Sequence, residues 1–81
     1  MPTDRDPRVH PMAGDETEGR DTIHTVTLIY SPRDWAPPRR GVVRVYLKWH
    51  DKHGHGGGEM QMTLAEWRRR QKNRKVVYAA D

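Results

Sequence analysis

The sequence predicts a small α+β domain, in which three or four antiparallel strands form a sheet and one C-terminal helix packs on one face of it. Three observations support this class. Residues 21–30 and 42–50 alternate between apolar and polar side chains, which is typical of strands. A helix-start signal precedes a dense run of cations near the C-terminus. The strands follow one another over short links, which favours antiparallel neighbours.

Residues 1–21 differ in composition from the rest of the chain. They carry six acids and three bases, a net charge of −3, whereas residues 22–81 carry 12 bases and five acids, a net charge of +7. Prolines and glycines interrupt the first segment, and it holds too few apolar residues to offset the entropy lost on ordering. We therefore expect a disordered acidic tail over 1–21 and one basic α+β domain over 22–81.

Composition excludes several classes of protein. The chain contains no cysteine, which excludes a disulfide scaffold and a thiolate zinc site and is compatible with a reducing cytoplasm. It has no apolar stretch suited to a secretory signal or to a membrane span of about 20 residues. Because hydrophobic residues make up 33% of the chain and phenylalanine is absent, the core must be small. We expect a cytoplasmic protein with no membrane partner and no cofactor.

The first predicted strand covers residues 21–30. Val26, Leu28 and Tyr30 alternate with threonine and isoleucine, and these residue types favour strands. His24 shares the parity of Val26, so we expect it to be half-buried near the end of the strand. Simple alternation therefore places one apolar face of this strand against the core.

The loop over residues 31–41 contains three prolines, which favour extended backbone. Trp35 in this loop either covers the thin core or is exposed as an anchor for a partner. Arg39 and Arg40 add positive charge next to the following strand.

Residues 42–50 form the strongest predicted strand. Its core face contains Val43, Val45, Leu47 and Trp49, and its solvent face contains Arg44, Tyr46, Lys48 and His50. Cations interleaved with an aromatic ring occur on sheet faces that bind single-stranded nucleic acid. An ordinary solvated face has the same pattern, so Tyr46 is a candidate partner anchor and no more.

A glycine-rich hairpin loop over residues 51–58 follows. His50, His53 and His55 lie near Asp51, and imidazole is a common ligand for zinc, copper and nickel. A loop this rich in glycine provides no rigid support for such ligands. We therefore assign no metal site and expect a flexible loop whose charge depends on pH.

The helix is predicted from Leu64 to about Asn73, after a short third strand over 59–62. Thr63 and Glu66 have the spacing of a capping box, and Met62 and Trp67 have that of a hydrophobic staple. At 100° per residue, one stripe of the helix faces the sheet and contains Leu64, Trp67 and Gln71. The apolar run over 76–78 is the candidate for a fourth strand.

The segment from Trp67 to Lys75 carries the densest positive charge of the chain. Its six cations are Arg68, Arg69, Arg70, Lys72, Arg74 and Lys75. In composition it resembles arginine-rich RNA-binding motifs. Because Gln71 faces inward, Asn73 is the side chain best placed to contact a base edge. We therefore expect an electrostatic surface for phosphates, which Arg39, Arg40, Arg44 and Lys48 would extend if they lie on the same side.

No set of residues with a familiar catalytic spacing is present. The single serine precedes a proline, and the glycine-rich loop lacks the Gly-Lys-Ser/Thr ending of a phosphate-binding loop. We predict a non-enzymatic module that binds nucleic acid, either DNA or RNA, mainly through phosphate contacts. The alternative is an accessory protein of the phage or mobile-element type, which binds a host protein machine such as RNA polymerase and regulates transcription through the same basic surface.

Overall fold

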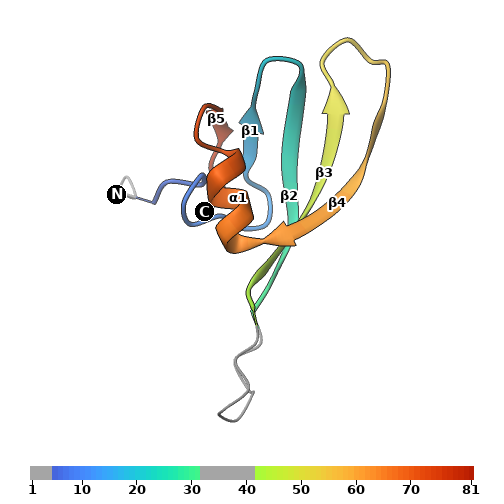
Figure 1. The fold of residues 1–81 in the computed structure, drawn as a ribbon. Coiled ribbons are helices and arrows are strands. Elements are labelled where there is room, and N and C mark those ends of the chain that lie inside the picture. The colour runs from blue at the N-terminus through green and yellow to red at the C-terminus, as the bar shows by residue number, and fades with distance from the viewer. Residues whose placement is uncertain (1–4, 32–41) are drawn as a thin grey trace, which may run out of the picture.

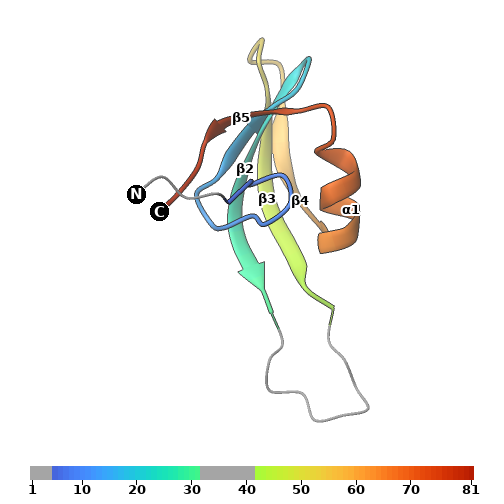
Figure 2. The same cartoon turned by 90° about the vertical axis from the view of Figure 1, so that its left-hand side faces the viewer.

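Five strands and one helix make up the part of the chain that the computed structural model describes, residues 5–31 and 42–81 (Figure 1). The elements are β1 (Glu16–Glu18), β2 (Thr22–Tyr30), β3 (Arg44–Asp51), β4 (Gly57–Thr63), α1 (Leu64–Arg70) and β5 (Lys75–Tyr78). All strand pairs are antiparallel, and α1 lies on one face of the sheet (Figure 2). The predicted α+β class is confirmed, while the sheet has more strands than expected.

The sheet has the spatial order β4–β3–β2–β1–β5. The first four strands form a meander, in which each strand pairs with the next one along the chain. The segment containing α1 then carries the chain from the β4 edge to the opposite edge, where β5 pairs with β1. The apolar run over 76–78 is thus part of a strand, because β1 offers it a partner.

Residues 5–21 belong to the fold, in contrast to the disordered tail that composition predicts; residues 1–4 lie outside the described residues. β1 pairs with a strand on each side, and Thr17 at its centre is fully buried. Asp15 is also fully buried, and its carboxylate accepts hydrogen bonds from Arg5, Met12 and Ala80. Backbone pairing and a buried ion pair therefore order a segment that has few apolar side chains.

The N-terminal segment runs along α1. The carbonyl of Pro7 accepts a hydrogen bond of 3.0 Å from the Trp67 indole, and that of Val9 accepts one of 2.9 Å from Arg68 Nε. Arg8 donates to the carbonyl of Arg74 at 3.1 Å, just beyond the helix. These bonds tie residues 7–9 to the helix.

A β-bulge divides β2 into two halves. Val26 lies opposite Leu47 and Leu28 lies opposite Tyr46, so Thr27 is the extra residue. Beyond the bulge the side chains change faces: Ile29 packs against the core, while Leu28 is 53% exposed. The prediction that Val26 and Leu28 share a face is therefore wrong, because one inserted residue reverses the parity of those that follow.

The core lies between the sheet and α1. It consists of Val26, Val45, Leu47, Met62 and Trp67. Met62 and Trp67 share this cluster, as their spacing predicts, and the Thr63 hydroxyl caps the helix by accepting a hydrogen bond of 3.2 Å from the Glu66 amide. The helix ends at Arg70, three residues earlier than expected, and Gln71 is its C-cap.

The buried Asp15 is expected to be a large contributor to stability. Burial raises the pKa of this carboxyl, but the hydrogen bonds from Arg5, Ala80 and Met12 outweigh burial and hold the pKa below its usual value. We expect Asp15→Ala to lower the free energy of unfolding by about 3–5 kcal/mol, because it removes the fully buried carboxylate that accepts hydrogen bonds from Arg5, Met12 and Ala80. Urea unfolding followed by circular dichroism measures this. The exposed Asp21→Ala is the control, and equal losses in the two variants would contradict the assignment.

Candidate nucleic-acid interface

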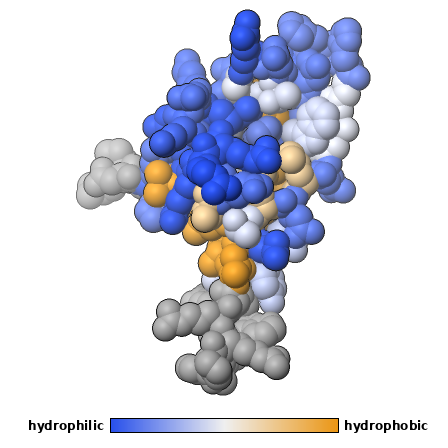
Figure 3. Space-filling view, viewed as in Figure 1, coloured by the Kyte–Doolittle hydropathy of each residue, from blue (hydrophilic) through white to orange (hydrophobic). Residues whose placement is uncertain are grey.

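Four of the predicted cations form a cluster at the C-terminal end of α1. We call Arg68, Arg69, Arg70 and Lys72 the helix-end cluster, and all four are exposed. The side chains of Arg69 and Arg70 are 73% and 55% exposed, and each lies near one oxygen of Glu66, at 3.6 and 3.4 Å. Such exposed ion pairs contribute little to stability and exchange readily for another anion. Hydrophilic side chains cover most of the face that carries α1 (Figure 3).

Arg74, which the sequence predicts to be a phosphate contact, instead forms hydrogen bonds within the fold. Its guanidinium donates to the carbonyl of Thr22 at 2.8 Å, and to the hydroxyls of Thr17 and Thr22 and the carbonyl of Thr17 at 3.2 Å. A Cβ at Gly19, in the turn beside it, would meet this guanidinium and force it to shift. Arg74 thus joins the hairpin of β1 and β2 to the chain after α1.

A buried polar network lies beneath the helix end. Gln71 faces inward, as its place on the helical stripe predicts, and is fully buried. Its Oε1 accepts a hydrogen bond of 2.6 Å from the Thr17 hydroxyl, and its Nε2 lies 3.4 Å from His24 Nδ1. Burial, with added repulsion from Arg74 and Arg70, lowers the pKa of His24 to about 4. His24 is therefore neutral at physiological pH, and the network holds the helix end at a defined place on the sheet.

Among the described residues, the face of the sheet opposite α1 carries exposed side chains, and we call it the open face. Val45 and Leu47 point into the core, so the alternating residues Arg44, Tyr46 and Lys48 point away from the helix. Arg44 and Lys48 therefore do not extend the helix-end cluster, because the sheet separates them. Lys75, at the start of β5, lies opposite Glu18 of β1.

The β2 bulge adds apolar side chains to this open face. Tyr30 lies opposite Arg44, and Leu28 lies opposite Tyr46. Neither side chain follows from the sequence pattern, because unbroken alternation assigns both to the core. A single threonine between two apolar residues gives no local signal of a bulge, so only strand register reveals this surface.

Several other predicted residues fall elsewhere. Trp35, Arg39 and Arg40 lie outside the described residues. The rings of His53 and His55 meet edge to face with centroids 6.4 Å apart, but residues 5–31 and 42–81 hold no group of three or more His, Cys, Asp or Glu arranged for a metal. In the same part of the chain, no helix has the length and apolar character needed to cross a membrane.

No protein-family model, no curated protein and no solved structure matches this chain. The assignment of an interface therefore depends on the geometry and charge of the chain itself.

Arg74 and Lys72 are expected to differ in what they contribute to folding. Arg74→Ala removes hydrogen bonds from a charged donor to two carbonyls and two hydroxyls, so we expect a loss of about 2 kcal/mol in the free energy of unfolding. Lys72→Ala changes an exposed side chain and should cost about 0.5 kcal/mol or less. Chemical denaturation of both variants checks this, and a Lys72 effect as large as that of Arg74 would contradict it.

His24 is expected to make stability depend on pH. The folded state holds its pKa at about 4, against 6.5 for the ordinary side chain, so the unfolded chain takes up the proton first. The contribution of neutral His24 is complete above pH 6.5 and is lost as the pH falls from there toward 4. As the pH falls across this range, the melting temperature of His24→Gln should decrease less than that of the unmodified chain. His53→Gln, on an exposed loop, is the control and should leave the slope unchanged.

Proposed function

We propose that this chain is a small non-enzymatic module that binds nucleic acid, chiefly through phosphate contacts. The observation that carries the proposal is the helix-end cluster. Four exposed cations lie on one short segment. Glu66 contacts two of them, Arg69 and Arg70, through weak exposed pairs, and Arg68 Nε donates to the carbonyl of Val9. Inward-facing residues of the same segment, Trp67 and Gln71, are fully buried and fix it on the sheet.

The rigid support of the cluster favours binding of a polyanion. Each arginine presents several N–H donors in a planar fork, which suits phosphate oxygens better than a single contact with Glu66. Phosphates that displace Glu66 would release counterions from the nucleic acid. With four cations engaged, the logarithm of the affinity should fall by about 3 to 4 units per tenfold rise in salt.

Charge reversal tests the helix-end cluster. We expect Arg69→Glu combined with Arg70→Glu to abolish most nucleic-acid binding in an electrophoretic shift assay, because four units of charge change at the surface. Single variants Arg69→Glu and Arg20→Glu provide a matched comparison, since both residues are exposed and both changes alter the charge equally. Only Arg69→Glu should weaken binding and reduce the salt dependence. Circular dichroism confirms that each variant is folded.

Two results would contradict the proposal. Unchanged binding in the double variant would show that the helix-end cluster is not the site. A protein that stays bound in a pull-down from nuclease-treated lysate, together with no shift of labelled nucleic acid, would instead favour the alternative of a regulator that docks these cations on an acidic protein surface.

A further inference from the structure

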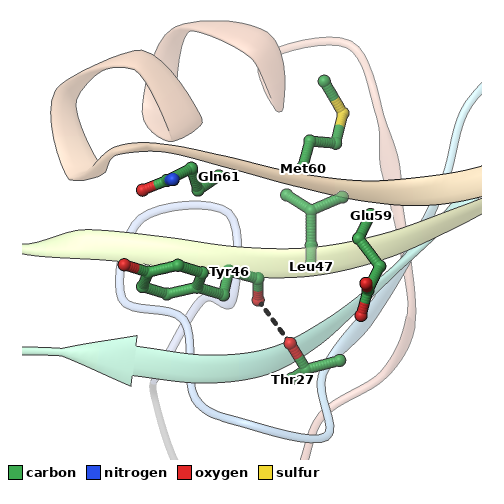
Figure 4. Close-up of a pocket in the computed structure, with 6 residues that line it drawn as sticks. All are labelled: Thr27, Tyr46, Leu47, Glu59, Met60 and Gln61. Atoms are coloured by element: carbon green, nitrogen blue, oxygen red, sulfur yellow. Dashed lines mark hydrogen bonds between the residues drawn. The ribbon is translucent and has the colours of Figure 1, made fainter.

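A hollow of about 270 Å³ lies on the open face of the sheet, where β2, β3 and β4 run side by side (Figure 4). Its lining residues are Thr27, Tyr46, Leu47, Glu59, Met60 and Gln61. Leu47 and Met60 belong to the core side of the sheet and lie beneath the hollow, while the side chains of the other four residues surround its opening. This volume is slightly below the range of about 300–1,000 Å³ typical of drug-sized ligands, so the hollow suits a smaller group.

The bulge in β2 shapes this hollow. Thr27 is the extra residue, and its hydroxyl donates to the carbonyl of Tyr46 at 3.2 Å. The small Thr27 side chain borders the hollow, while Leu28 lies directly opposite Tyr46 and Tyr30 lies beyond it, opposite Arg44. An aromatic ring at the rim of a small hollow offers a surface on which a nucleobase stacks.

Cations flank the Tyr46 ring along β3. Arg44 and Lys48 lie two residues before and after Tyr46 on the same face, and both are exposed. Two residues of a strand span about 7 Å, so each cation is within reach of a phosphate next to a base stacked on Tyr46. Stacking rings flanked by cations are the arrangement that binds single-stranded nucleic acid. A base within a duplex is stacked on both sides and cannot enter such a hollow.

Two polar side chains of β4 complete the hollow. Gln61 lies opposite Tyr46, and Glu59 lies opposite Lys48. An ionised carboxylate only accepts hydrogen bonds, whereas an amide both donates and accepts. Adenine, cytosine and guanine carry an exocyclic amine whose N–H groups can donate to Glu59, whereas the one donor that thymine and uracil offer on their pairing edge is a ring N–H set between two carbonyl oxygens, which a carboxylate repels.

We propose that this hollow binds one unpaired base of a single-stranded nucleic acid and prefers amine-bearing bases over thymine and uracil. Tyr46 would stack on the base, Glu59 and Gln61 would contact its edge, and Arg44 and Lys48 would hold the adjoining phosphates. The inference rests on the proposed function, because it assumes that the chain binds nucleic acid. It assigns base preference to the open face and leaves general affinity to the helix-end cluster on the opposite side.

Fluorescence anisotropy with labelled 12-mers tests the preference. We compare oligo(dC) with oligo(dT) in DNA and oligo(rC) with oligo(rU) in RNA, because each comparison sets two pyrimidines of similar size against each other. We expect the cytosine strand to bind at least about fivefold more tightly than its partner in one or both pairs. A 12-base-pair duplex should bind more weakly than the cytosine strands.

Three variants connect the preference to the hollow. Tyr46→Ala should weaken binding of the cytosine strand about tenfold, because a stacking surface is lost. Tyr78→Ala is the matched control, since Tyr78 is 56% exposed on β5 and does not line the hollow. Glu59→Gln should reduce the ratio of the affinities for the cytosine and thymine strands, because the thymine strand should bind more tightly to this variant. Damage to the fold would not make any strand bind more tightly.

The outcomes separate this inference from the proposed function. Equal binding of cytosine and thymine or uracil strands, or a preference that Tyr46→Ala and Glu59→Gln leave intact, would overturn the inference. If salt-sensitive binding is then still lost on reversal of Arg69 and Arg70, the proposed function stands. If no oligonucleotide of any kind binds, both are wrong.

Discussion

The buried indole of Trp67 is the contact on which the remaining structure depends. Its ring is fully buried among the core side chains, and its N–H donates to the carbonyl of Pro7. A buried N–H without an acceptor costs about 1–3 kcal/mol. The N-terminal segment therefore stabilises the core by supplying this acceptor, and the core in turn holds that segment in place. A seven-residue helix is also too short to be stable alone, so α1 exists because Trp67 holds it on the sheet.

Hydrogen bonds between buried polar groups help to stabilise this fold, whose hydrophobic core is small. Asp15, Thr17 and Gln71 are as inaccessible as the core hydrophobics. Within the described part of the chain, every buried side-chain nitrogen or oxygen has a hydrogen-bond partner. Such groups stabilise a fold only while all of them are paired, and they favour one arrangement over others. Segments that are distant in sequence, around Asp15 and around Gln71, are therefore joined at a defined register.

The sheet separates the chain's surface charges into two groups with different properties. The helix-end cluster is dense in cations and contains no aromatic ring, which suits contacts with phosphates in any sequence. The open face carries Arg44 and Lys48 together with two tyrosines, a hollow and two polar side chains that can contact base edges. The two faces thus suit affinity and base preference respectively, and neither depends on residues of the other.

Features that arise from local chemistry were predicted from the sequence. Period-two alternation located β2 and β3, the Thr63 spacing located the start of α1, and helical periodicity turned Gln71 inward. These signals involve residues within a few positions of each other, so they act before any distant contact forms. The density of cations near the C-terminus is likewise a property of the sequence alone.

Only the tertiary structure decided which of those residues face solvent and which segments join the sheet. β1 is ordered because strands on both sides supply its backbone partners, and Thr27 forms a bulge because of its register against β3. Arg74 leaves the charged surface because two threonines from another hairpin surround its guanidinium. The physical reason is the same in each case: backbone pairing and buried polar contacts join residues far apart in the chain, and neither hydrophobicity nor local spacing records them.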